Sequence, residues 1–192
     1  MDPEKMAITG IVLVVVIVGL AIGVSFFAFE PNGGGSGNDT TLTGIVADRD
    51  LLELDLQLPS SWQFDMADGS TLTMSELDGK IILVDLMATW CSSCASQNEY
   101  LETIYETLGG PLEILSLTVD HSETAQMMAD YQNDRGLPWD HGVDTGSKFT
   151  TYFSVTSVPT LILIDSNGYF RYMHIGVWSD AILTDRITTI MQ

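Results

Sequence analysis

Hydrophobic residues in the second half of the chain form short continuous runs, and a segment with helical spacing separates two of them. Residues 81–88 and 112–119 are such runs, and they predict strands that are covered on both faces of a sheet. Between them, apolar positions recur every three or four residues from Ser92 and stop before Gly109-Gly110-Pro111. This spacing and its glycine-proline end predict a helix over residues 92–108.

Weaker patterns predict the remaining elements. Residues 52–58 alternate between leucine and polar residues, as a half-buried strand does, and residues 62–66 indicate a second strand that turns at residues 67–69. Strands then alternate with helices before a final antiparallel pair, so the predicted fold class is α/β, with a mixed sheet and helices on both faces. The other expected elements are helices over residues 122–131 and 147–153, a hairpin with strands at 160–164 and 169–175, and a last helix from Ser179 to Met191.

The N-terminal part of the chain has a different pattern. Residues 6–29 carry no charge, and a helix of that length would span about 36 Å, more than the ~30 Å hydrocarbon core of a bilayer. We therefore expect a transmembrane helix there. Lys5 precedes this segment, and no lysine or arginine follows it before Arg49. This asymmetry predicts that residues 1–5 are cytoplasmic and that the rest of the chain lies outside.

A linker is expected between the membrane segment and a single folded domain. Residues 30–44 are rich in glycine, serine and asparagine, which is typical of flexible coil. Asn38 begins a glycosylation sequon within the linker, although the segment also reads simply as a polar tether. Residues 45–192 then form one domain, long enough to bury a core without a disulfide staple.

The charge of the chain limits its partners. It contains 7 basic and 26 acidic residues, for a formal net charge of −19 at pH 7. This balance excludes nucleic-acid binding by electrostatics, and it favours cationic over acidic partners. An adaptation to high salt, in which self-repulsion is screened, would explain the same composition.

The chemistry is expected at Cys91 and Cys94, the only cysteines of the chain. They lie where a predicted strand ends and a predicted helix begins, so unpaired N–H groups of the first helical turn favour a thiolate at Cys91. Cys94 follows one turn later, within reach of a mixed disulfide on Cys91. A structural disulfide this short would stabilise little, and a zinc site needs further ligands, so neither a metal nor another cofactor is expected.

Four separated landmarks give residues 62–192 a resemblance to the thioredoxin fold, and more narrowly to its membrane-tethered TlpA/ResA-like branch. They are the entry segments 64–69 and 77–80, the active-site segment 84–94, the loop Val158-Pro159-Thr160, and Gly168 with Gly176-Val177-Trp178-Ser179. In that family a cis-proline, here Pro159, lies against the redox-active disulfide. The resemblance thus implies a substrate groove formed by Trp90, Val158, Pro159 and Gly176, with Cys91 as nucleophile and Cys94 as resolving thiol.

Asp85 lies within an apolar run, where burial would raise its pKa toward neutrality. Thioredoxin has a buried aspartate at the same spacing before its first cysteine, which implies proton exchange between Asp85 and Cys94. Two positions depart from the family pattern. Ser116 stands where thioredoxin has a lysine, and Gln97 stands where TlpA-like proteins often have glutamate.

The resemblance implies a membrane-tethered thiol–disulfide oxidoreductase that reduces extracytoplasmic proteins, for example in cytochrome c or copper-site maturation. Its partners would be protein disulfides and a membrane electron donor, with residues 6–29 in the lipid bilayer. The alternative is a Sco-like copper-binding assembly chaperone. That family normally has three residues between its cysteines and a histidine in a late loop, whereas this chain has two residues between them and no histidine at 157–164.

Overall fold

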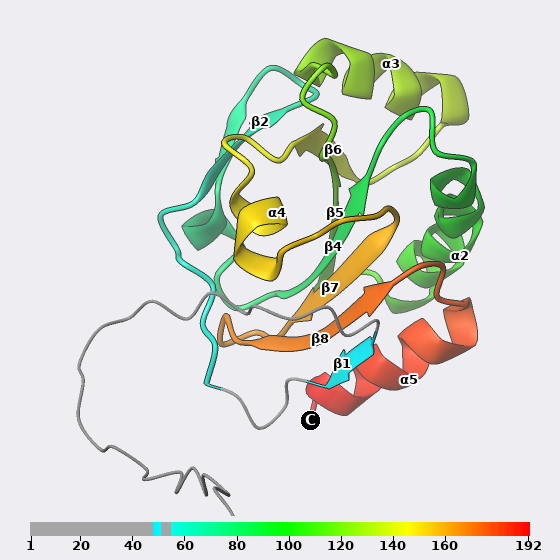
Figure 1. The fold of residues 1–192 in the computed structure, drawn as a ribbon. Coiled ribbons are helices and arrows are strands. Elements are labelled where there is room, and N and C mark those ends of the chain that lie inside the picture. Colours follow the sequence, from blue (N-terminus) through cyan, green and yellow to red (C-terminus); the bar gives the residue numbers. More distant parts are fainter. Residues whose placement is uncertain (1–47, 51–54) are drawn as a thin grey trace, which may run out of the picture. The chain divides into compact units, whose positions relative to one another are not determined.

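The two most apolar runs of the chain pair as parallel strands in the middle of a sheet. The computed structural model describes residues 48–50 and 55–192 (Figure 1). Strand β4 (Ile81–Met87) lies parallel to β5 (Leu112–Thr118), and β7 (Thr160–Ile164) runs antiparallel on the other side of β4. All residues of β4 and β7 are buried, as expected for strands covered on both faces.

The remaining strands extend this centre to both edges. On the β7 side lie the antiparallel strands β8 (Phe170–Ile175) and β1 (Asp48–Asp50). On the β5 side, β6 (Asp140–Val143) is parallel to β5, and the order continues to β2 (Gln63–Met66) and β3 (Thr71–Thr73). The predicted mixed α/β sheet is therefore confirmed.

Helices cover the two faces of the sheet, and β4 divides its side chains between them. Leu83 and Met87 belong to one core, together with residues of α2 (Ser92–Leu108), α3 (Ala125–Arg135) and α5 (Asp180–Ile190). Val84 and Leu86 belong to a second core with α4 (Lys148–Phe153) and the short 3₁₀ helix η1 (Met74–Leu77). Figure 1 shows α4 on the opposite side of the central strands from α2 and α5.

Most predicted elements are present, with shifts at their ends. The bounds predicted for α2 and β7 are confirmed. The helix expected at 122–131 begins instead at Ala125, because the side chain of Thr124 caps the amide of Met127, and it continues to Arg135. Residues 51–54 of the strand expected at 52–58 lie outside the described residues, and Gln57 forms only an isolated bridge with Tyr169.

The predictions about the N-terminal part concern residues that the structure does not describe. These are the cytoplasmic segment 1–5, the membrane helix 6–29, the linker 30–44 and the sequon at Asn38. Within residues 48–50 and 55–192, no helix combines the length and the apolar character that a membrane span requires.

Candidate active site

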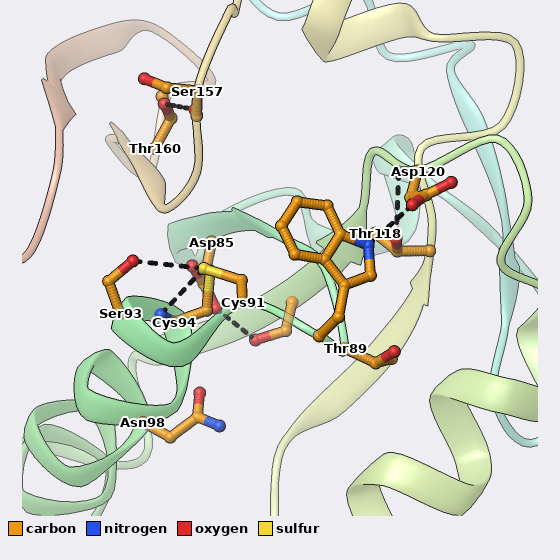
Figure 2. The surroundings of a disulfide bond; sticks show 12 residues. Asp85, Thr89, Cys91, Ser93, Cys94, Asn98, Thr118, Asp120, Ser157 and Thr160 are labelled. Carbon is orange, nitrogen blue, oxygen red and sulfur yellow. Dashed lines mark hydrogen bonds between the residues drawn. A yellow bond between two sulfur atoms is a disulfide. The ribbon is translucent and has the colours of Figure 1, made fainter.

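Cys91 and Cys94 form a disulfide at the junction between β4 and α2 (Figure 2). Cys91 is the N-cap of α2, and its sulfur accepts a hydrogen bond from the backbone N–H of Cys94 at 3.1 Å. The Ser93 hydroxyl lies 3.3 Å from the same sulfur. Cys91 retains 6% of its exposure, whereas Cys94 is fully buried. In the reduced form, these donors would stabilise negative charge on the sulfur that faces outward.

A groove of about 650 Å³ opens beside Cys91, and we call it the Cys91 groove. Its walls come from the loop between β4 and α2 with the first residues of α2, from the residues that follow β5, from α4 and from the loop that precedes Pro159. Trp90 is 69% exposed at its rim. Asp120 alone carries a charge among the described residues that line the groove, which include Cys91, Ser93, Val119, Val155 and Val158.

The Trp90 ring is held by Asp120. Its indole N–H donates to Oδ2 of Asp120 at 2.7 Å, while the other carboxylate oxygen accepts from the N–H and the hydroxyl of Ser122. The Ser122 hydroxyl first, and then the Trp90 indole, lower the pKa of Asp120 to about 2. The carboxylate therefore stays charged over the whole physiological pH range.

A second carboxylate fixes the backbone just before Trp90. Glu123 is buried, and it accepts hydrogen bonds from the backbone N–H of Thr89 at 3.0 and 3.2 Å and from the hydroxyls of Thr89 and Thr118. Thr118 ends β5, so Glu123 ties the loop that carries Trp90 and Cys91 to the neighbouring strand. Sequence analysis missed Glu123 and Asp120, because neither lies near the cysteines in the chain.

The loop before β7 contains the cis peptide bond Val158–Pro159, as the resemblance implied. Val158 lines the Cys91 groove, whereas Pro159 and Gly176, also expected there, are not among its lining residues. Gly176 instead donates its backbone N–H to the Pro159 carbonyl at 2.8 Å. The loop is thus anchored to the end of β8, and a further bond from Thr160 to the Ser157 carbonyl closes it (Figure 2).

Asp85 is completely buried in β4, on the face that is covered by α2. Burial raises its pKa from 3.8 to about 7, and a hydrogen bond from the Ser116 hydroxyl opposes this rise. That bond joins Ser116 Oγ to Asp85 Oδ2 at 3.0 Å, while Oδ1 has no hydrogen-bond partner. The predicted burial of the Asp85 carboxyl is confirmed, whereas its partial protonation at neutral pH and its role in proton exchange stay predictions.

Known proteins share sequence similarity with this chain. Residues 79–170 match the family model described as thioredoxin-like. The thiol-disulfide oxidoreductase ResA of Bacillus anthracis is 26% identical over 130 residues, covering 67% of this chain and 73% of ResA. The thiol:disulfide interchange protein DsbE of Vibrio cholerae is 24% identical over 168 residues, covering 86% of this chain and 85% of DsbE.

Solved structures agree on the fold. The chain matches StoA from Bacillus subtilis with a TM-score of 0.57 and 15% identity, over 68% of this chain and 98% of StoA. A DsbF homologue from Corynebacterium diphtheriae matches with a TM-score of 0.62 and 17% identity, over 82% of this chain and 98% of the homologue. At these identities the solved structures show a shared fold alone. The two sequence relatives are named for an activity, which is thiol–disulfide exchange.

Proposed function

We propose that this chain, a thioredoxin-like protein thiol–disulfide oxidoreductase, reduces disulfides of extracytoplasmic proteins through Cys91 and Cys94. One observation carries the proposal. The outer sulfur caps a helix and opens on the Cys91 groove, and the inner sulfur is sealed behind it. This asymmetry suits a nucleophile with a resolving partner, and it does not suit two equivalent thiols.

The reaction takes two exchanges. In the reduced enzyme, the Cys91 thiolate attacks one sulfur of the substrate disulfide, which forms a mixed disulfide and releases the other sulfur as a thiolate. Cys94 then attacks Cys91, so the Cys91–Cys94 bond forms and the bond to the substrate breaks. The substrate gains two electrons and two protons, and the enzyme disulfide is left oxidised.

Asp85 serves the second exchange. Cys94 is a thiol in a dry site, so it needs a base before it can attack. A buried carboxyl whose pKa is near 7 is ionised often enough to accept that proton at neutral pH, and it can later return the proton when the disulfide is reduced. Asp85 would thus move the proton while the sulfur atoms exchange bonds.

The Cys91 groove would hold the substrate as an extended segment. Val158 lines the groove, and its backbone would pair with the segment as a strand does, while Trp90 offers an exposed aromatic surface. Asp120 adds a permanent negative charge where no lining residue is basic among those described. With the net charge of −19, this favours substrates with a basic residue next to their cysteine.

The N-terminal part would place the domain. Residues 6–29 would anchor the chain in the cell membrane, and residues 30–44 would let the domain reach its partners outside it. A membrane protein that carries a reduced dithiol would supply electrons to Cys91–Cys94. Substrates in cytochrome c or copper-site maturation fit the TlpA/ResA-like resemblance.

Reduction of a disulfide by the full-length chain tests this proposal. The pre-reduced protein, kept in mild detergent, is mixed with insulin, and the newly formed substrate thiols are counted. Wild type should reduce the disulfide, Cys91→Ser should be inactive, and Cys94→Ser should accumulate a mixed disulfide on Cys91. Equilibration with glutathione gives the direction, because a strongly oxidising potential would overturn the reductase assignment.

A further inference from the structure

Three buried side chains form a line of hydrogen bonds that ends at Asp85. The indole N–H of Trp139 donates to the Ser116 hydroxyl oxygen at 2.9 Å, and the Ser116 hydroxyl lies 3.0 Å from Oδ2 of Asp85. Their exposed fractions are 3%, 0% and 0%. Among the described residues, neither Ser116 nor Trp139 makes a hydrogen bond to a sulfur atom. Any effect of these two residues on the cysteines must therefore act through Asp85.

The chemistry of the donors gives this line a direction. An indole nitrogen only donates, so it occupies a lone pair of Ser116, and the single hydroxyl hydrogen of the serine must point elsewhere. Asp85 Oδ2 is the one acceptor for that hydrogen among the described residues. The Trp139 contact therefore makes Ser116 a donor toward Asp85.

The two oxygens of the Asp85 carboxyl then differ. Oδ2 already accepts a hydrogen bond, whereas Oδ1 is buried with no partner. We infer that Ser116 and Trp139 are positioning residues that reserve Oδ2 as an acceptor, so that Asp85 exchanges its proton through Oδ1. This inference rests on the proposed role of Asp85 as the proton acceptor for Cys94.

Strand register holds the three groups together. Asp85 lies directly opposite Ser116 in the parallel pairing of β4 and β5, and Ser116 lies opposite His141 in the pairing of β5 and β6. The Trp139 ring stacks on His141 at 5.7 Å, just before β6 begins. The indole is thus fixed by β6, and the hydroxyl by β5.

The two titratable rings near this line, those of His141 and Tyr131, are uncharged around pH 7. Burial lowers the pKa of His141 to about 4 and raises the pKa of Tyr131 on α3. Arg135, Asp85 and Glu123 are the charged groups that act on the Tyr131 hydroxyl. A pH midpoint near 7 in the second exchange would therefore belong to Asp85 or to the Cys94 thiol whose proton it takes, and Asp85→Asn distinguishes the two.

Ellman's reagent, an aromatic disulfide used here as the substrate, allows the rates of the two exchanges to be measured separately. One nitrothiobenzoate leaves when Cys91 attacks, and a second leaves when Cys94 resolves the mixed disulfide, so stopped-flow absorbance of the full-length reduced protein gives the rate of each. The second rate is measured from pH 5 to 10 for wild type, Asp85→Asn, Ser116→Ala and Trp139→Phe. Urea unfolding of each variant establishes that it is folded.

We expect Ser116→Ala to move the pH midpoint of the second rate upward, because the lost hydrogen bond favoured the ionised carboxylate. At pH 7 the second rate should fall roughly fivefold, and at pH 9 or above it should match or exceed wild type. Trp139→Phe, which keeps the ring and removes the donor, should shift the midpoint in the same direction by less. If Ser116→Ala does not fold, Trp139→Phe carries the test.

The outcomes separate the inference from the proposal on which it rests. If Asp85→Asn keeps the wild-type profile, the proposed proton role of Asp85 is wrong. If Asp85→Asn removes the midpoint while the folded Ser116 and Trp139 variants keep the wild-type profile, the positioning inference alone is wrong. A loss of stability without a shift in the profile also counts against it, since a purely structural role predicts that result.

Discussion

The side-chain amide of Gln97 makes two hydrogen bonds with the backbone of Trp178. Its nitrogen donates to the Trp178 carbonyl at 3.1 Å, and its oxygen accepts from the Trp178 N–H at 2.8 Å. Both residues are buried, and the pair joins α2 to the segment that precedes α5. A glutamate, which the TlpA-like pattern often has here, would lack the donor when ionised.

Gln97→Glu should therefore destabilise the protein. The substitution leaves the Trp178 carbonyl without a partner and buries a carboxylate, which should lower the free energy of unfolding by about 2–3 kcal/mol. Urea unfolding of the full-length oxidised protein measures the effect. Gln192→Glu, at the exposed C-terminus, introduces the same charge and should change stability little; equal losses in the two variants would contradict the role of the Gln97 amide.

Stability should depend on pH through Asp85. Below pH about 4 this carboxyl is protonated in both states, and between about 4 and 7 the unfolded chain releases the proton while the folded protein keeps it. The unfolded state is favoured as pH rises through this range, and the effect levels off above it. Relative to Asp85→Asn, wild type should lose roughly 4 kcal/mol of stability between pH 4 and 8.

Urea unfolding of both oxidised proteins at pH 4, 6 and 8 gives that difference. All other titrating groups contribute equally to the two proteins, so they cancel when wild type is compared with the variant. A constant difference across this range would mean that the Asp85 carboxyl keeps an ordinary pKa in the folded state.

Asp120 should influence which substrates are reduced. We expect Asp120→Asn to slow the reduction of a peptide disulfide with lysine beside its cysteine, by up to about fivefold at low salt. A peptide with glutamate in that position should be reduced as fast as before or faster. Asp134→Asn, on the exposed surface of α3, removes the same charge elsewhere and serves as the control.

The ratio of kcat/KM for the two peptides, at low and high salt, reports this effect. Added salt should bring the ratios of wild type and Asp120→Asn together, because it screens the exposed charge. Identical peptide preferences in wild type and Asp120→Asn at low salt would remove Asp120 from substrate selection.

The elements that were predicted well from the sequence are those whose own residues show the pattern of a helix or a strand. Helix α2 is bounded by Cys91 at one end and Gly109 at the other, and β7 is a continuous apolar run. Strand β6 was missed, because its sequence Asp-His-Gly-Val has no strand pattern. It is a strand because it pairs with β5 and β2, and a side chain at Gly142 would approach the Asp65 carbonyl to 2.7 Å.

Site residues that are close together in the chain were also predicted, whereas those brought together by the fold were missed. Cys91, Cys94 and Asp85 lie within ten residues of one another, so their spacing was readable from the chain. Trp139 was missed because it reaches Ser116 across 23 residues and only through the pairing of three strands. Gly176 was expected in the groove, but it is not among the lining residues and instead donates its backbone N–H to the Pro159 carbonyl, a distinction that depends on tertiary geometry.

We propose that Cys91 is the accessible thiolate and that Cys94 is the sheltered resolving thiol. Alkylation of the fully reduced full-length protein by iodoacetamide between pH 5 and 9, followed by mass spectrometry of the peptides, measures both sulfurs in one experiment. Cys91 should be modified at least about tenfold faster than Cys94 at pH 7, because only its sulfur lies on the groove and at the helix N-terminus. Equal rates for the two cysteines, or no modification of either one, would contradict the account.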